Sequence, residues 1–153
     1  MDKHMSLDEV IAGLQAKYPE QLEVVEDSLQ PAVRVKSDIL LKVMQELKEE
    51  YGLDFLADLT AVDLGDEGFR AINHVMSWKP YRMLRVEVDV PKNRPRVPSL
   101  TDLWAAANVQ EREAFDMFGI IYEGHPKLTR ILLSDNFEGY PLRKDFKITS
   151  RRK

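Results

Sequence analysis

One segment of the chain, residues 84–90, alternates apolar and charged residues with a period of two, and this pattern constrains the fold more than any other. Four aliphatic residues face one way and three charged residues face the other: Leu84, Val86, Val88 and Val90 against Arg85, Glu87 and Asp89. Such alternation predicts a strand with one face in the core and the other in water.

Two further segments, 53–63 and 69–78, have the composition of strands and come directly before this one. The turn between them is expected at 64–68, and Lys79-Pro80 is expected to turn the chain into the third strand. Connections this short predict antiparallel hairpins.

The N-terminal part of the chain adds two helices and two short strands. Ser6 and Glu9 form the pattern of a capping box, so a helix is expected over 7–18, and strands are expected near 22–26 and 32–36. Ser37 is expected to cap a second helix that ends at Gly52.

After the third long strand, the segment 91–98 holds three prolines and is expected to be a loop. A helix is expected over 101–118, with a break near Asn108 and an end at Gly119. The order α-β-β-α-β-β-β predicts a two-layer α+β domain with a largely antiparallel sheet, residues 1–118. Residues 119–153, which we call the tail, are expected to be extended and to wrap the domain or lie on a partner.

Composition narrows the classes of protein. The chain has 153 residues, which suits one domain, and it has no cysteine. It therefore cannot form disulfides, use a cysteine nucleophile or hold an iron–sulfur cluster through thiolates. No run approaches the roughly 18 apolar residues of a membrane span, and residues 1–10 have no apolar signal segment.

Charge is distributed unevenly along the chain. The formal net charge is −4, yet residues 142–153 carry six basic residues and one acidic residue. A basic segment on an acidic body is typical of a docking arm, although a solvated terminus has the same composition. The acidic body and the lack of a nucleic-acid-binding signature argue against a nucleic-acid partner.

The densest group of chemically capable residues lies in 111–119. On a helix, Glu113 and Asp116 share a face, which would suit acid–base catalysis or a divalent metal. Arg112 is placed to neutralise Asp116, so an ion-paired helix is the favoured interpretation. No phosphate-binding loop is present.

The histidines form no metal-binding spacing. His4 lies near the N-terminus, and His74 is expected to pack in or near the core on one strand face with Ile72, Met76 and Trp78. His125 lies in a Gly-His-Pro turn and is the histidine best placed for a functional role.

A series of blocks resembles the 30 kDa-type subunit of proton-pumping NADH:quinone oxidoreductase, respiratory complex I. In this sequence the blocks are residues 97–101, 103–104, 107–108, 110–120, 124–126, 128, 130–132 and 138–146. Residues 59–63 and the order of the elements agree with the family's α+β fold more loosely. Val109 stands where the family usually has Trp, and Lys147 where it commonly has Pro.

The resemblance implies a non-catalytic subunit of the peripheral arm. Its tail would pack on the large hydrogenase-like subunit that helps to form the quinone site, beside neighbouring peripheral-arm subunits, at the cytoplasmic face of the membrane. NADH, flavin, iron–sulfur clusters and quinone would be bound by partner subunits, and this chain would bind no cofactor and no metal.

The residues expected at the partner interface, or to order it, follow from the same blocks. They are Glu111, Arg112, Glu113, Asp116, Gly119, His125, Pro126, Arg130, Leu132, Gly139, Leu142, Arg143, Lys144, Asp145 and Phe146. Two alternatives stay open: the matching subunit of a ferredoxin- or coenzyme F₄₂₀-dependent relative or membrane-bound hydrogenase, and a free-standing acid–base enzyme that uses Glu113, Asp116 and His125.

Overall fold

A five-stranded mixed sheet forms the centre of the computed structural model, which describes residues 5–26 and 28–148. The strand order is β1 (Leu22–Val24), β2 (Ala32–Val35), β5 (Tyr81–Val90), β4 (Phe69–Trp78) and β3 (Phe55–Asp63). Strands β3, β4 and β5 form the expected antiparallel meander, and β2 pairs with β5 in parallel. The α+β fold with a largely antiparallel sheet is therefore confirmed.

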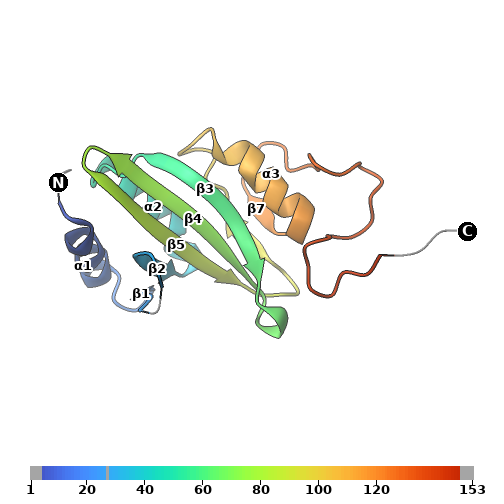
Figure 1. Cartoon of the computed structure of the whole chain (residues 1–153), viewed down its shortest axis with the longest axis horizontal. Coiled ribbons are helices and arrows are strands. Elements are labelled where there is room, and N and C mark those ends of the chain that lie inside the picture. The colour runs from blue at the N-terminus through green and yellow to red at the C-terminus, as the bar shows by residue number, and fades with distance from the viewer. Residues whose placement is uncertain (1–4, 27, 149–153) are drawn as a thin grey trace, which may run out of the picture.

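Helices α1 (Leu7–Lys17) and α2 (Leu40–Glu49) cover one face of this sheet, and the other face is open to the viewer in Figure 1. The aliphatic residues of β5 point toward the helices and are buried, as their alternation predicted. They pack with Val10, Leu14, Val43 and Leu47 of the two helices in one core. The two layers form because each helix and the sheet have one apolar face to cover.

The polar face of β5 departs from the expectation of a fully solvated surface. Glu87 is only 3% exposed, because the guanidinium groups of Arg34, Arg70 and Arg85 lie 2.9, 3.5 and 2.7 Å from its carboxylate. Alternation placed Glu87 on the correct face, but it could not show that three arginines would cover it.

The local signals at the helix ends were mostly correct. Ser6 and Glu9 make both hydrogen bonds of the capping box at α1, and Gly52 has a φ of 80° just after α2. Ser37 does not cap α2, because a 3-10 turn (Ser37–Ile39) comes first and the helix begins at Leu40 without a side-chain cap.

Residues 96–123 differ most from the sequence-based expectation. Helix α3 spans Ala107–Phe118, so residues 101–106 form turns in place of a first helical piece. Two short parallel strands that the sequence did not suggest, β6 (Arg96–Pro98) and β7 (Ile121–Glu123), lie beside it. Ile120 and Tyr122 are buried in the core, so the core continues past residue 118.

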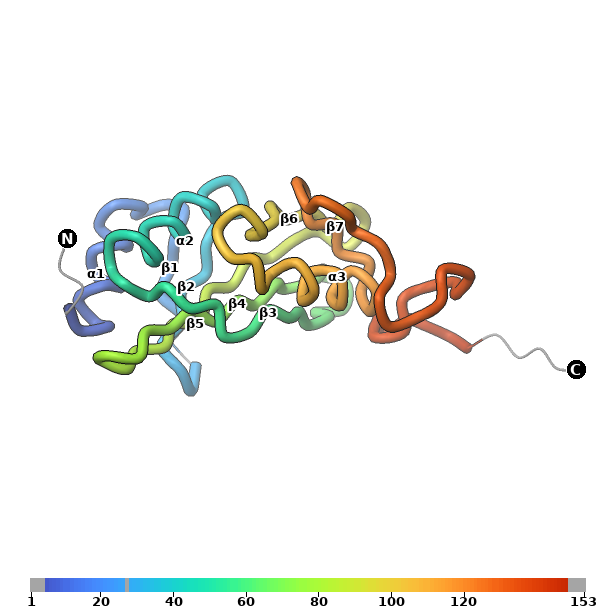
Figure 2. Tube along the Cα trace, turned by 90° about the horizontal axis from the view of Figure 1, so that it is seen from above, coloured from blue at the N-terminus to red at the C-terminus, as the bar shows by residue number. Residues whose placement is uncertain are grey.

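Helix α3 runs along β3 at the edge of the sheet, where the Leu59 N–H donates to the Gln110 side-chain carbonyl at 2.7 Å. The described part of the tail continues from β7 as an irregular chain that projects from the end of the molecule away from α1 (Figures 1 and 2). The sheet and α3 therefore act as a base that presents the tail at one end.

Candidate partner-binding site

Asp116, in the last turn of α3, is the point at which the tail is attached to the helix. Its carboxylate is fully buried, and one oxygen accepts the backbone N–H groups of Ile131, Leu132 and Leu133 at 3.1, 2.7 and 2.9 Å. The other oxygen lies 2.5 Å from Nη1 of Arg130. One carboxylate thus holds four consecutive residues of the tail.

These contacts also fix the charge of Asp116. Burial alone would raise the pKa of the carboxyl group, because it disfavours the ionised form. The three backbone N–H groups and the Arg130 guanidinium outweigh burial and lower the pKa below its ordinary value of 3.8. Asp116 is therefore an ionised acceptor at neutral pH, fully buried and held by four donors of the tail.

Arg112 does not neutralise Asp116, so that expectation was wrong. Its guanidinium instead donates to the Thr129 backbone and side-chain oxygens and to the Arg130 carbonyl, at 3.0, 3.2 and 3.0 Å. The i, i+4 spacing suggested a partner within the helix, but the acceptors of Arg112 belong to the tail. Arg112 and Asp116 both bind the tail from one side of α3.

The paired-carboxylate interpretation of Glu113 and Asp116 finds no support in the geometry. Asp116 is fully engaged with the tail, and Glu113 is partly exposed beside it. Within the described residues, no group of three or more histidine, aspartate or glutamate side chains could hold a metal ion.

Arg130 organises the first part of the tail around its guanidinium group. Besides Asp116, it donates to the Gly139 carbonyl at 2.7 Å and lies over the rings of Phe137 and Tyr140. Gly139 has a φ of 98°, a conformation open to glycine, and a Cβ there would come within 3.0 Å of Phe146. Residues 130–140 of the tail therefore form a folded loop and not a free extended strand.

Arg143 organises the second part of the tail, residues 140–146, around its guanidinium group. Its Nε donates to the Phe118 carbonyl at 2.6 Å, and its guanidinium lies between the rings of Phe69 and Tyr140. It caps the end of α3 and ties it to β4. The sequence placed Arg143 outside the core with a docking role, whereas its charged group is used within the chain.

Gly119 makes the close approach of Arg143 possible. It ends α3 with a φ of 79°, as predicted, and a Cβ at this position would lie 2.6 Å from Nη2 of Arg143 and 2.8 Å from the Tyr140 ring. A glycine is therefore needed both for the backbone conformation and for space.

Further contacts secure residues 142–146. The Leu142 N–H donates to the Met117 carbonyl at 3.0 Å, and the Lys144 N–H donates to the Asp63 carboxylate at 2.7 Å. The Lys144 side chain is left exposed, and Asp145 lies 3.6 Å from Lys92. Phe146 stacks on Phe137 with ring centroids 5.9 Å apart. The tail is thus preorganised on the body of the chain.

Glu111 and His125 have internal roles that the sequence did not reveal. The Ser99 hydroxyl and the Leu100 N–H both donate to the buried Glu111 carboxylate at 2.7 Å, although burial raises its pKa overall. His125 bonds the Asn108 carbonyl through Nε2 and accepts the Lys127 N–H at Nδ1, each at 2.9 Å, which requires the neutral Nε2–H form. Pro126 beside it is exposed.

While Arg130 and Arg143 are directed inward, several large apolar side chains of the tail point outward. Leu132, Leu142 and Ile148 are 59, 55 and 86% exposed. A groove of about 620 Å³ lies beside Ile148 and is also lined by Leu133, Phe137 and Phe146. Exposed apolar groups on an ordered frame are typical of protein interfaces.

The sequence missed several residues that build this site. Phe137, Tyr140, Thr129 and Asp63 were not among the residues expected at the interface. One oxygen of the Asp63 carboxylate accepts the Gly65 N–H in the 64–68 turn at 2.7 Å, and the other accepts the Lys144 N–H of the tail. The basic residues at 151–153 lie outside the described residues, as does His4.

Sequence and structure comparisons agree on one family. The family model described as "Respiratory-chain NADH dehydrogenase, 30 Kd subunit" matches residues 33–152. An NADH-quinone oxidoreductase subunit of Moorella thermoacetica is 51% identical over 93% of this chain and 96% of its own length. The equivalent subunit of Roseiflexus castenholzii is 42% identical over 92% of this chain and 85% of its own length.

Two solved structures share the fold. The trypsin-resistant fragment of Nqo5 has a TM-score of 0.70 and 33% identity, over 81% of this chain and all of the fragment. A chain of the membrane-bound sulfane sulfur reductase, an archaeal respiratory membrane complex, has a TM-score of 0.77 and 26% identity, over 92% and 85%. In the part of the chain that the structure describes, no helix is long and apolar enough to cross a membrane.

Proposed function

The chain belongs to the family of the 30 kDa subunit of respiratory-chain NADH dehydrogenase, the NADH-quinone oxidoreductase, and from this we propose that it is a scaffold within that enzyme. Its tail docks on the large hydrogenase-like subunit that helps to form the quinone site. Catalysis and electron transfer take place on partner subunits, and this chain stabilises the interface between them.

One observation carries the proposal: the tail uses two arginines, Arg130 and Arg143, for bonds within its own chain and leaves large apolar side chains exposed. Arg130 binds the Asp116 carboxylate and Arg143 binds the Phe118 carbonyl, both in α3, while Leu132 and Leu142 remain exposed. A preordered segment loses little conformational entropy on binding, so more of the contact energy appears as affinity.

The same contacts argue against a free-standing enzyme. Of its three proposed catalytic groups, Asp116 binds four tail residues and His125 has both ring nitrogens bonded to backbone. Glu113 would be left without a second group to complete an acid–base pair.

The absence of cysteine supports the assignment of electron transfer to partners. Flavin, iron–sulfur clusters, NADH and quinone would be bound by neighbouring subunits, and this chain would reside with them at the cytoplasmic face of the membrane. The likeness to a chain of a sulfane sulfur reductase complex keeps open a related parent complex fed by ferredoxin, coenzyme F₄₂₀ or hydrogen.

Affinity purification from native membranes through a tag on the full chain tests the proposal. Wild-type chain should recover the large quinone-site subunit, and Leu132→Ser with Leu142→Ser should recover much less. Leu41→Ser is the matched control, since Leu41 is a 42% exposed leucine on α2, away from the tail. Recovery of no oxidoreductase subunit by the wild type would disprove the proposal, as would equal recovery by the double variant.

A further inference from the structure

The edge of β5 near Met83 is left without a strand partner, and the reason lies in one proline. On this side, β2 pairs with β5 from Ala32 opposite Arg85, and the Arg85 N–H donates to the Pro31 carbonyl at 3.1 Å. The next bond of a parallel ladder would run from the N–H of residue 31 to the Met83 carbonyl. Proline has no N–H, so the ladder stops there.

The direction of the Met83 backbone groups follows from strand geometry. Backbone groups of alternate residues point to the same edge, so those of Met83 point toward the β2 side, as those of Arg85 do. Within residues 5–26 and 28–148, Met83 has no backbone partner on that side. An unpaired N–H and carbonyl in the middle of a sheet are a template for another strand.

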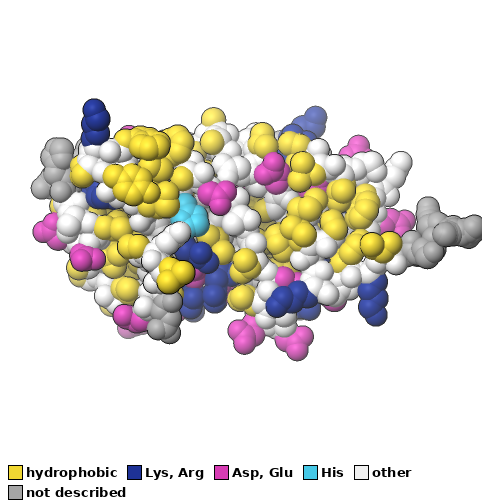
Figure 3. Space-filling model, in the orientation of Figure 1, with side chains coloured by type: hydrophobic (Ala, Val, Ile, Leu, Met, Phe, Trp, Pro, Cys, Tyr) yellow, Lys and Arg dark blue, Asp and Glu magenta, His cyan; other side chains and the backbone are white. Residues whose placement is uncertain are grey.

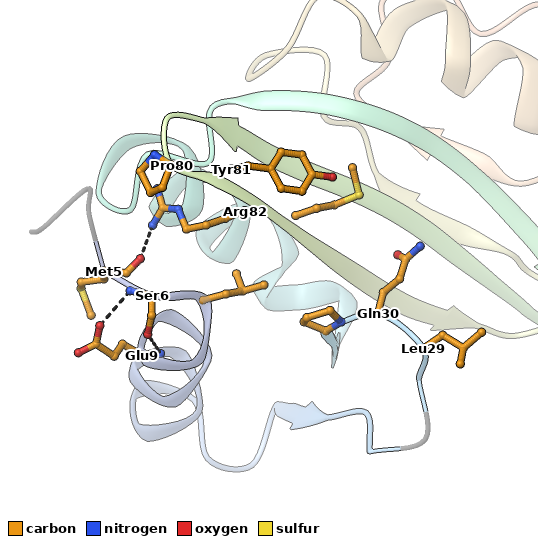
Figure 4. A pocket seen from close by; sticks show the side chains of 11 residues that line it. Met5, Ser6, Glu9, Leu29, Gln30, Pro80, Tyr81 and Arg82 are labelled. Atoms are coloured by element: carbon orange, nitrogen blue, oxygen red, sulfur yellow. Dashed lines mark hydrogen bonds between the residues drawn. The ribbon is translucent and has the colours of Figure 1, made fainter.

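A groove of about 760 Å³ lies along this edge (Figure 4). The start of α1 forms one wall, the loop through Leu29 and Gln30 forms the other, and the beginning of β5 forms the back. The first wall is held in place, because the buried Arg82 donates to the Met5 carbonyl at 2.8 Å and to the Tyr51 carbonyl at 2.8 Å. The groove is therefore built into the fold.

The lining of the groove is mostly apolar and continues onto an aromatic surface. Leu7, Pro31 and Met83 lie within it, and Tyr81 leads onto the uncovered face of the sheet. There Trp78 and Tyr81 are 65 and 63% exposed, and the Phe55 ring lies 5.9 Å from that of Trp78. Figure 3 shows this apolar surface at the end of the sheet face near the N-terminus. Exposed aromatic groups of this kind are typical of interface centres.

We propose that a single extended segment of a partner subunit adds to the sheet at this edge, pairs its backbone with Met83, and places apolar side chains against Tyr81 and the groove. The inference rests on the proposed function, since it requires a partner within the complex. It assigns a second contact surface, at the opposite end of the molecule from the tail (Figure 2).

The shape of the groove selects this occupant over a second copy of the chain. The β5 strand of another copy is flanked by its own β2 and β4, so it cannot enter between α1 and the 29–31 loop. A lone extended segment is narrow enough and supplies the N–H and carbonyl groups that Met83 lacks.

Amide hydrogen exchange in the wild-type protein is the decisive experiment. It compares the isolated full chain with the complex purified through its tag, in peptides that isolate the Met83 amide. The expected result is rapid exchange in the isolated chain and at least about tenfold slower exchange in the complex. Equal exchange in both samples would overturn the inference while leaving the tail-docking proposal intact.

Two variants separate backbone pairing from side-chain packing. Met83→Pro removes the N–H without removing any bond within the described chain, and Met83→Leu keeps it. If both variants melt within a few degrees of wild type, Met83→Pro should lose a protein of the complex that Met83→Leu retains. Slow exchange already present in the isolated chain at high concentration would identify a second copy as the occupant and contradict the proposal.

Discussion

Arg130 and Asp116 face each other across the junction between the tail and α3, with Nη1 and Oδ1 2.5 Å apart and little solvent access to either. Asp116 lies in the last turn of α3, and Arg130 lies in the irregular part of the tail that follows β7. Because the three backbone N–H groups that follow Arg130 converge on the same carboxylate, the order of the tail depends on one side chain.

Asp116→Asn should therefore loosen the tail while leaving the sheet intact. A hydrogen bond to a charged group contributes about 1.5 to 3 kcal/mol, which corresponds to roughly 10- to 100-fold in exchange rate. Amides 131–133 should exchange faster by that factor, as measured by hydrogen exchange. Glu113→Gln, one turn away and partly exposed, is the control and should leave these amides unchanged.

Gly119→Ala should destabilise the chain through both backbone strain and a clash. A non-glycine residue at positive φ costs about 1 to 3 kcal/mol, and the new Cβ would also meet Arg143 and Tyr140. Gly124→Ala separates the two effects, because Gly124 has a φ of 92° with nothing within 4 Å of a Cβ. Urea unfolding should show a larger loss for Gly119→Ala, and equal losses would show that the close approach of Arg143 is unimportant.

Tyr122→Phe should stabilise the chain. Among the described residues, the Tyr122 hydroxyl is buried without a hydrogen-bond partner, and burial together with the nearby Glu111 charge raises its pKa. An unsatisfied buried polar group costs about 1 to 3 kcal/mol, so its removal should raise the free energy of unfolding by about 1 kcal/mol. Tyr18→Phe should do the reverse, since the Tyr18 hydroxyl donates to Glu46.

Glu111 should make the free energy of unfolding fall as pH rises. This is the opposite of the effect expected from Asp116, whose pKa is lowered in the folded chain. The pKa of Glu111 in the folded chain is raised above 4.5, so the folded state binds a proton more tightly than the unfolded state does. Its contribution to stability therefore falls as pH rises from about 4.5 through the folded pKa. Glu111→Gln should remove this slope in urea unfolding measured across that pH range, and an unchanged slope would contradict the assignment.

Much of the fold could be predicted because its signals are local. The alternation in β5, the capping box at Ser6 and the glycine at 119 each depend on residues close in sequence. Strands β6 and β7 could not be predicted, because each is three residues long and pairs with a distant segment.

The site shows the same division between local and distant contacts. Helical spacing correctly placed Arg112 and Asp116 on one side of α3, but it assigned Asp116 the wrong partner, because Arg130 is fourteen residues away in sequence. Glu87 was misplaced in water for a similar reason, since Arg34 comes from β2, 53 residues earlier. The family resemblance supplied the docking role, and the internal use of Arg143 required the folded tail.

Contact between the outward apolar face of the tail and a partner subunit is central to the proposed function, and site-specific photo-crosslinking tests it most directly. A photo-reactive amino acid at position 142 of the full, tagged chain is irradiated in the assembled complex and in the isolated chain. We expect an adduct with the large quinone-site subunit in the complex and none between chains in isolation. An intact complex that yields no adduct from position 142, or from position 132 in a parallel sample, would contradict the proposed function.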